Sequence, residues 1–309
     1  MKGQIVFMKG IEISENFYRA SIAPMLHAKF PEYEHRIAVG LVGQGSECFG
    51  FDDAISQDHD FGKRIFLWIT REDDQKIGMA LKDAYRHIAI EAGEFAPDRS
   101  GVFTIEQFYK QLIGHPSHPS ANNEWMCIPE YALATAVNGA VFRDDLGAFS
   151  AIRKKLSEGF PQDVALKKLA GHLALMAQSG QYNFPRSLKR QENSAAALAL
   201  YEFIDHSLHV LFILNGSYTP YYKWRFRAAS ELPFLAGLAH DIEEFTTEPI
   251  GWHLIDRIEM IANRITTELQ RRGFSSSNET FLEAQAKEVT KRIQDPALLQ
   301  LHLMEFGAE

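Results

Sequence analysis

The chain has 309 residues, of which 46% are hydrophobic and 23% charged, as in a packed globular protein long enough for two domains. Its formal net charge of −8 disfavours nucleic acid as a partner, because non-specific binding requires Lys and Arg to neutralise phosphates. No continuous apolar stretch approaches the roughly 20 residues of a membrane span, and the first residues lack a signal-peptide pattern. Cys48 and Cys127 are too few for a disulfide framework or a thiolate zinc site. We therefore expect a reduced, cytoplasmic protein with no membrane partner.

The first half of the sequence mixes helical and strand-like patterns. Short apolar runs rich in β-branched residues predict strands, and spaced apolar residues predict helices. Along the chain we expect a helix over 14–35, strands over 39–42 and 65–69, a helix over 74–92, a strand running into a helix within 100–114, a loop over 114–124, and a further strand-like run within 138–147.

The second half carries helical periodicity and no good strand candidates. Gly, Pro and small polar residues separate the periodic segments. The expected helices cover residues 163–179, 192–214, 220–245, 252–272 and 279–293. The pattern predicts an α+β protein, in which a mixed α/β sheet domain (1–147) is followed by an all-α helical bundle domain (148–309).

An acidic loop separates the first two predicted strands. Asp58 and Asp60 lie two residues apart at the entry to a strand, so both carboxylates leave the same face. Such a pair is typical of Mg²⁺ sites that also take phosphate oxygens and water. Gly45 and Ser46, after the preceding strand, offer a tight turn, backbone N–H donors and a hydroxyl that suit a triphosphate. The alternative is that these residues only form turns, in which Asp and Ser are common.

The order strand, Gly-Ser, spacer, Asp-x-Asp, strand resembles the signature of the nucleotidyltransferase superfamily that includes kanamycin nucleotidyltransferase and DNA polymerase β. The run "GSECFGFDDAISQDHDFG" is more closely similar to a bacterial nucleotidyltransferase-like family of unknown function, whose members carry G-S-E-x-x-G-x-D-x-x-x-S-x-D-H-D. Stretches at 125–147, 159–164 and 214–224 fit the same family. The resemblance covers roughly residues 15–240 and implies a helical C-terminal domain.

This resemblance implies a function and a set of site residues. It implies Mg²⁺-dependent (or Mn²⁺-dependent) transfer of a nucleoside monophosphate from an NTP, with ATP expected, to a hydroxyl of an unidentified small-molecule or macromolecular acceptor. It assigns Gly45 and Ser46 to the nucleotide phosphates and Asp58 and Asp60 to the metal. Lys223, in "YTPYYKWRFR", matches the lysine that a helical domain contributes to the phosphates; the alternative is a surface lysine beside aromatic residues.

Two further positions complete the predicted site. Arg64 is in phase with Asp58 on an ideal strand and offers a bidentate phosphate contact, although a salt-bridged arginine at a strand end fits equally well. Many superfamily members place a third carboxylate on a later strand, and the matching strand "SGVFTI" has none. Glu106 is the expected third catalytic carboxylate, with Asp98 as the other candidate. The departure leaves open a catalytically weak or inactive nucleotide-binding or partner-binding protein.

A rival motif lies in the helical half. His240 and Asp241, with His206 and His209 upstream and Asp256 downstream, resemble the ligand set of helical metal-dependent phosphohydrolases. The Gly-Lys that usually follows His-Asp in those enzymes is missing. His172, His206 and His209 equally fit packed or surface histidines.

Overall fold

The structure is a computed structural model that describes residues 8–57, 62–93 and 100–308. It divides into two compact units. The first comprises Met1–Pro119 and Ala132–Glu158, and the second comprises Ser120–Tyr131 and Gly159–Glu309. Each unit is described by itself.

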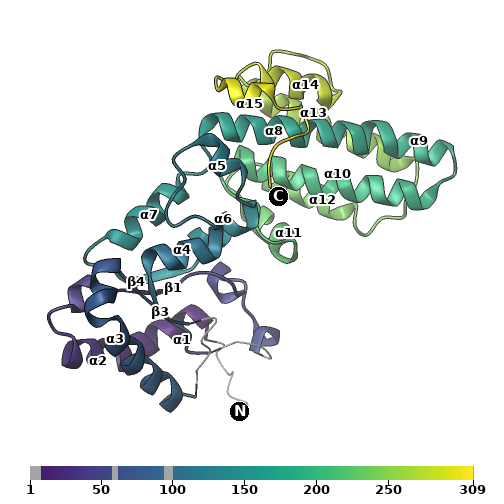
Figure 1. Cartoon of the computed structure of the whole chain (residues 1–309). Coiled ribbons are helices and arrows are strands. Elements are labelled where there is room, and N and C mark those ends of the chain that lie inside the picture. Colours follow the sequence, from purple (N-terminus) through teal and green to yellow (C-terminus); the bar gives the residue numbers. More distant parts are fainter. Residues whose placement is uncertain (1–7, 58–61, 94–99, 309) are drawn as a thin grey trace, which may run out of the picture. The chain divides into compact units, whose positions relative to one another are not determined.

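The first unit contains a four-stranded mixed sheet (Figure 1). The strands β1 (Ala38–Leu41), β2 (Phe66–Ile69), β3 (Gly101–Thr104) and β4 (Ala140–Arg143) lie in the order β3-β2-β1-β4. Strand β1 pairs antiparallel with β2 and β4, whereas β2 and β3 are parallel. Consequently β1 finishes at the same end of the sheet at which β2 and β3 begin. We call this end of the strands the loop edge.

Helices cover the sheet of the first unit. They are α1 (Gly10–Phe17), α2 (Ala23–Lys29), α3 (Arg71–Glu91), α4 (Ile105–Ile113), most of α6 (Glu130–Val137) and α7 (Ala148–Ser157), with the π-helical η1 (Tyr18–Ile22) and the 3₁₀ turns η2 (Glu34–Arg36), η3 (Glu47–Phe49) and η4 (Ala54–Gln57). Side chains of α1, α2 and α3 form one buried core with inward-facing residues of the strands. Trp68 of β2 stacks on Phe149 of α7 with 3.8 Å between ring centroids, which ties α7 to this unit, whereas the expected boundary at residue 147 places that helix in the second domain.

The second unit consists of helices in the part of the chain that the structure describes. They are α5 (Asn122–Met126), α8 (Gln162–Met176), the π-helical η5 (Ala177–Asn183), α9 (Phe184–Lys189), α10 (Asn193–Leu214), the 3₁₀ turn η6 (Tyr222–Trp224), α11 (Arg225–Ser230), α12 (Ala236–Glu244), α13 (His253–Arg271), α14 (Leu282–Thr290) and α15 (Pro296–Gln300). Helix α8 is central, because both α10 and α14 pack along it (Figure 1). The predicted α+β class is confirmed.

Most predicted elements are confirmed within a few residues, and the differences have local causes. Helix α3 begins three residues early because Thr70 Oγ1 accepts a hydrogen bond from Asp73 N, an N-cap. The single helix predicted over 220–245 is broken into η6, α11 and α12. The break contains Pro233 and a left-handed Leu235 with φ +64°, neither of which continues a helix.

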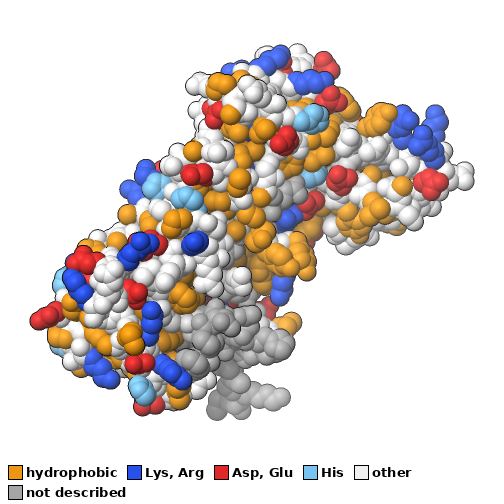
Figure 2. Space-filling view, in the orientation of Figure 1, with side chains coloured by type: hydrophobic (Ala, Val, Ile, Leu, Met, Phe, Trp, Pro, Cys, Tyr) orange, Lys and Arg blue, Asp and Glu red, His pale blue; other side chains and the backbone are white. Residues whose placement is uncertain are grey.

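One helix among the described residues, α10, is long and apolar enough to cross a membrane by length and composition. However, 72% of its most apolar window is buried inside the structure, as in the core helix of a bundle. Figure 2 shows charges of both signs over the visible face, with Lys and Arg side chains gathered at α9, which carries Arg186 and Lys189.

Candidate functional site

The predicted phosphate turn lies at the loop edge of the first unit. Gly43 and Gly45 have φ of +126° and +127°, a region that favours glycine. The side-chain amide of Asn138 holds this turn from the other side: Gly43 N donates to Asn138 Oδ1 at 2.9 Å, and Asn138 Nδ2 donates to Gly43 O at 2.8 Å. Arg153 of α7 in turn donates to Asn138 O at 2.6 Å. The turn is therefore fixed by residues about 95 positions away along the chain.

The backbone N–H groups of Gly45 and Ser46 donate to no acceptor in the parts of the chain described. Both residues are partly exposed. Adjacent N–H groups in a turn of this kind form an anion-binding nest. The arrangement has the donors that a phosphate requires.

Arg64 does not project freely from this turn. It is buried, forms an ion pair with the buried Glu47, and donates to Gln44 O at 3.0 Å. A Cβ atom on Gly45 would meet both side chains of this pair. The Arg64–Glu47 pair thus packs against the turn at Gly45. A direct phosphate contact by Arg64 stays a prediction.

A cavity of about 190 Å³ adjoins the turn within the first unit. On one side it is lined by Val42, Gly43 and Gln44, and on the other by residues of β2 and α4, including Phe66, Phe108 and Gln111. Arg64 also lines it. The loop edge therefore offers a recess beside the backbone donors.

The predicted carboxylates are not assembled among the described residues. Asp58, Asp60 and Asp98 lie outside the residues that the structure describes. Glu106 lies in the first turn of α4, directly after β3 ends, and hence at the sheet edge opposite the Gly45–Ser46 turn. Its Oε2 atom is buried and has no hydrogen-bond partner in the described structure. The geometry does not bring Glu106 to the turn.

The other predicted positions belong to the second unit. Lys223 is exposed in η6, with Nζ 5.0 Å from the ring centroid of Trp224. His240 is exposed and lies 3.7 Å from Glu244, while Asp241 pairs with Arg264. Neither His240 nor Asp241 belongs to a metal-type cluster in the described parts of the chain, so the phosphohydrolase motif is not assembled there.

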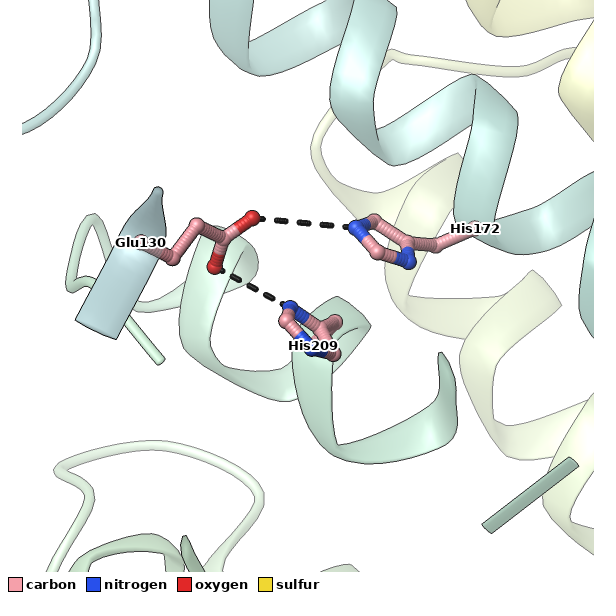
Figure 3. A group of neighbouring side chains, drawn as sticks. All are labelled: Glu130, His172 and His209. Atoms are coloured by element: carbon pink, nitrogen blue, oxygen red, sulfur yellow. Dashed lines mark hydrogen bonds and ion pairs between the residues drawn. The ribbon is translucent and has the colours of Figure 1, made fainter. Parts of the chain in front are cut away.

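A different polar cluster is buried inside the second unit (Figure 3). Glu130 at the start of α6, His172 of α8 and His209 of α10 each have at most 1% of their surface exposed. Ligand-type atoms of the three residues all lie within 4.8 Å of one another. His209 Nδ1 lies 3.1 Å from Glu130 Oε2, and His172 Nε2 lies 3.7 Å from Glu130 Oε1. The pairing of α8 with α10 brings residues 37 positions apart into one site.

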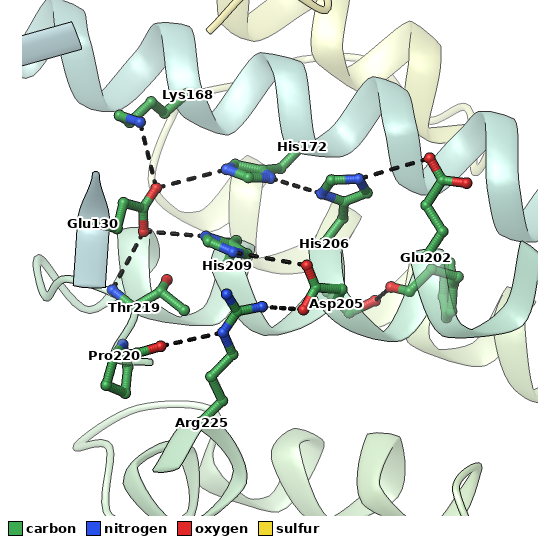
Figure 4. A network of polar contacts seen from close by, with 12 residues as sticks. Glu130, Lys168, His172, Glu202, Asp205, His206, His209, Thr219, Pro220 and Arg225 are labelled. Atoms are coloured by element: carbon green, nitrogen blue, oxygen red, sulfur yellow. Dashed lines mark hydrogen bonds and ion pairs between the residues drawn. The ribbon is translucent and has the colours of Figure 1, made fainter. Parts of the chain in front are cut away.

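Two chains of polar contacts lead from Glu130 toward the surface (Figure 4). In one, His172 Nδ1 lies 3.0 Å from His206 Nδ1, and His206 Nε2 lies 4.0 Å from Glu202. In the other, His209 Nε2 lies 4.0 Å from Asp205, which pairs with Arg225. Four of these residues belong to α10, and their positions, 202, 205, 206 and 209, have the spacing of one face of a helix.

Burial controls the charges of the cluster. It lowers the pKa of His172 well below the ordinary imidazole value and that of His206 to about 4. Burial also raises the pKa of the Glu130 carboxyl, but its contacts with the imidazoles of His172 and His209 outweigh burial and hold that pKa well below its usual range. Lys168 Nζ, 3.6 Å from Glu130 Oε1, supplies a countercharge. At neutral pH the cluster therefore contains an ionised Glu130 carboxylate and neutral His172 and His206 imidazoles.

Sequence patterns predict no role for Glu130, which stands as a lone acid in "CIPEYALA". His172, in "LAGHLALM", and His206 and His209, in "DHSLHVLF", interrupt apolar helical runs. Polar residues within a buried helical face require partners, and this signal points to a buried site without saying which helices share it.

The comparisons with known proteins concern this half of the chain. Residues 125–225 match a family described as a domain of unknown function (DUF4037). The matched region contains Glu130, His172 and His209, whereas the Gly45–Ser46 turn lies outside it. No curated protein and no solved structure matches the chain significantly. A relation to a family of unknown function is therefore supported, and the wider nucleotidyltransferase assignment stays a prediction.

Proposed function

We propose that the chain transfers a nucleoside monophosphate from an NTP to an acceptor hydroxyl in an Mg²⁺-dependent reaction. The observation that carries the proposal is the pair of uncommitted backbone donors at Gly45 and Ser46, in a glycine turn at the loop edge. Since β1 and β2 are antiparallel, the loop that contains Asp58 and Asp60 in sequence starts and finishes at that same edge. The order of elements thus supports a phosphate site and a carboxylate pair at one edge.

In the proposed reaction the acceptor hydroxyl oxygen forms a bond to the α-phosphorus of the NTP. The bond from that phosphorus to the bridging oxygen breaks, and pyrophosphate leaves with the electron pair. The hydroxyl proton passes to a carboxylate, which we assign to the Asp58–Asp60 pair because Glu106 lies at the other end of β3. Mg²⁺, held by Asp58 and Asp60, would neutralise charge on the triphosphate.

The described residues would bind and position the nucleotide. The N–H groups of Gly45 and Ser46 would donate to phosphate oxygens, and Asn138 would keep the turn in its donor-exposing conformation. The buried Arg64–Glu47 pair would support the turn by packing against Gly45. The resemblance also assigns Lys223, in the second unit, to the phosphates as a point charge, and this assignment stays a prediction from the sequence.

A second candidate is favoured by the position of Glu106. If the third carboxylate of active relatives has no replacement at the loop edge, the chain would bind a nucleotide without efficient transfer. Among the described residues at that edge, Glu47 is a carboxylate already paired with Arg64. A chain without transfer activity would act as a nucleotide-binding or partner-binding protein.

Calorimetric titration with ATP, GTP, CTP and UTP tests both candidates, with Mg²⁺ and without it. We expect binding that requires Mg²⁺ and is lost in the double variant Asp58→Ala/Asp60→Ala. A matched control is Asp144→Ala/Asp145→Ala, which removes two acids from the same unit next to β4. Retained metal-dependent binding in the Asp58/Asp60 variant would overturn the proposal.

Pyrophosphate release separates transfer from binding alone. Release that depends on an added acceptor and disappears in Asp60→Asn supports transfer. Mg²⁺-dependent binding without any release across a panel of hydroxyl-bearing acceptors supports the second candidate.

A further inference from the structure

The buried cluster of Glu130, His172 and His209 contains atoms that lack partners. Glu130 Oε1, His172 Nε2 and His209 Nε2 are buried and form no hydrogen bond in the described structure. Leaving such atoms unpaired in a protein interior costs about 1–3 kcal/mol each. Glu130 Oε1 and His172 Nε2 face each other at 3.7 Å and call for a shared partner, whereas His209 Nε2 faces Asp205 on the other side of its ring.

The spacing of the ligand-type atoms fits one metal ion. Zinc binds imidazole nitrogen and carboxylate oxygen at about 2.0–2.2 Å, so two ligands of a tetrahedron lie about 3.3 Å apart. The separations from His209 Nδ1 to Glu130 Oε2 and from His172 Nε2 to Glu130 Oε1, 3.1 and 3.7 Å, bracket that value, and one ligand-type atom of each of the three residues lies within 4.8 Å of the other two. The two imidazole rings are nearly parallel, with 11° between their planes, so binding requires one ring to rotate toward the ion.

The contacts around Glu130 are of two kinds. His172 Nδ1–His206 Nδ1 at 3.0 Å and His209 Nδ1–Glu130 Oε2 at 3.1 Å are within hydrogen-bond distance. The contacts His172–Glu130, His206–Glu202 and His209–Asp205, at 3.7–4.0 Å, are longer than hydrogen bonds. The side of Glu130 that faces His172 is therefore not closed by a direct hydrogen bond.

A metal ion at Glu130 would bind in place of the direct contacts between the carboxylate and the imidazoles of His172 and His209. His172 Nδ1–H would then donate to His206, 3.0 Å away, and His209 Nε2–H would face Asp205, 4.0 Å away. Histidines bound to metals usually have such an outer partner.

We propose that Glu130, His172 and His209 bind one divalent transition-metal ion of the zinc class. Two imidazoles and one carboxylate are the ligand set of many Zn²⁺ sites, whereas Mg²⁺ prefers oxygen ligands in an octahedron. The ion links the start of α6 to α8 and α10. This site is separate from the proposed nucleotide site and does not depend on it.

Lys168 and the C-terminal segment shape access to the site. The Lys168 ammonium lies 3.6 Å from Glu130 Oε1 and donates to Ala308 O at 2.8 Å, so it neutralises Glu130 before the ion arrives. The ring of Phe306 lies 4.5 Å from that of His172 and covers it.

The test uses the full chain carrying Cys127→Ser, which removes an exposed thiol. The protein is stripped with a chelator and titrated with Zn²⁺ by calorimetry and with Co²⁺ by visible absorption. We expect one ion per chain, intense tetrahedral Co²⁺ bands, no competition from Mg²⁺, and a higher Tm with Zn²⁺. His172→Phe and His209→Phe should lose the site while keeping a buried ring. His206→Phe, which removes an outer partner, should weaken binding about 10–100-fold.

The exposed His240 provides a matched control, since His240→Asn removes a histidine that lies outside the cluster. Zn²⁺ binding that persists unchanged in both His172→Phe and His209→Phe would overturn the proposal. If those variants do not fold, the Co²⁺ spectrum of the parent chain decides. A folded parent chain that shows no tetrahedral Co²⁺ bands and no Zn²⁺ stoichiometry near one would equally overturn it.

Discussion

His172 and His206 face each other through their Nδ1 atoms at a distance of 3.0 Å. One of the two nitrogens must carry the shared proton, because two unprotonated nitrogens at this distance repel each other. In the metal-free cluster we expect His172 to keep its own proton on Nε2, which faces Glu130 Oε1 at 3.7 Å, so the shared proton belongs to His206. The direction of this one hydrogen bond therefore reports what occupies the position beside Glu130.

Zinc should reverse the direction of that hydrogen bond. When His172 Nε2 binds the ion, the remaining proton of His172 moves to Nδ1, and His206 changes from the Nδ1–H to the Nε2–H tautomer. Nitrogen-15 NMR of labelled imidazoles, with and without Zn²⁺, measures both tautomers. His240, which is exposed, should show no change. A cluster in which His206 keeps its tautomer at saturating Zn²⁺ would contradict binding of the ion through His172 Nε2.

Asn138→Ala should loosen the Gly43 turn. It removes two hydrogen bonds to Gly43, each contributing about 0.5–1.5 kcal/mol to stability. We expect a loss of about 1–3 kcal/mol in the free energy of unfolding together with weaker Mg²⁺–ATP binding. Asn215→Ala is the matched control, because Asn215 holds Leu211 O and Phe234 O through a similar amide in the second unit. Equal effects of the two substitutions on ATP affinity would remove the turn from the nucleotide site.

The elements that the sequence predicted best are those whose pattern is local. Helix α10 was expected over 192–214 and spans Asn193–Leu214, because a long apolar run between two polar turns has few alternatives. The segment 220–245 was less predictable, since the break at Leu235 depends on a left-handed residue that is not glycine. Local pattern alone does not indicate such a position.

The two candidate sites also differ in how much of each can be predicted from local sequence pattern. Gly45 and Ser46 follow a strand in sequence, so their place at a strand end was predictable. Glu130, His172 and His209 come from three segments that meet only through the packing of α8 on α10, and nothing local pairs them. The outer residues of α10 share one helical face, which is visible in sequence, but their inner partner Glu130 is not.

Lys223→Ala should weaken triphosphate binding and leave the fold intact. Lys223 is exposed, so its removal costs little stability, whereas a charged hydrogen bond to phosphate contributes about 1.5–3 kcal/mol. Calorimetry with Mg²⁺–ATP measures the difference. Lys189→Ala removes an exposed lysine on α9 and should bind ATP as the parent chain does. Equal affinity of the Lys223 and Lys189 variants would leave Lys223 without a role in nucleotide binding.

Acid should destabilise the chain partly through Glu268 of α13. Hydrogen bonds from Arg271 and Arg272 outweigh burial and lower the pKa of Glu268 to about 2, against 4.5 as its ordinary value. A lowered folded-state pKa stabilises the fold above about pH 4.5, and this contribution is lost as the pH falls toward 2. Because Arg271 is exposed and solvent screens its charge, Glu268→Gln should lower the free energy of unfolding by about 1–2 kcal/mol at pH 7 and flatten the stability curve between those pH values. Denaturant unfolding at several pH values measures this pH dependence of stability, with Glu283→Gln as a control at another glutamate. An unchanged acid profile in Glu268→Gln would show that the pair with Arg271 and Arg272 contributes nothing.

The adjacent lysines Lys167 and Lys168 offer the sharpest comparison for the metal site. Both are buried in α8 and donate to backbone carbonyls near the C-terminus, Lys167 to Leu301 and His302 and Lys168 to Ala308. Lys168 alone of the two also lies beside Glu130. Lys168→Met should cost about 3–5 kcal/mol without metal, since it leaves a buried carboxylate without its countercharge.

With Zn²⁺ bound, Lys168→Met should instead raise the affinity for the ion and regain stability. Removing the ammonium removes a cation that competes for Glu130, so Lys168→Met should bind Zn²⁺ more tightly and recover stability as the ion saturates the site. Lys167→Met should lose stability without changing Zn²⁺ affinity. Paired calorimetry and denaturant unfolding of the two variants measure both effects. If Lys168→Met bound Zn²⁺ no more tightly than Lys167→Met, the ammonium and the ion would not share Glu130, and the carboxylate would have to be removed from the ligand set.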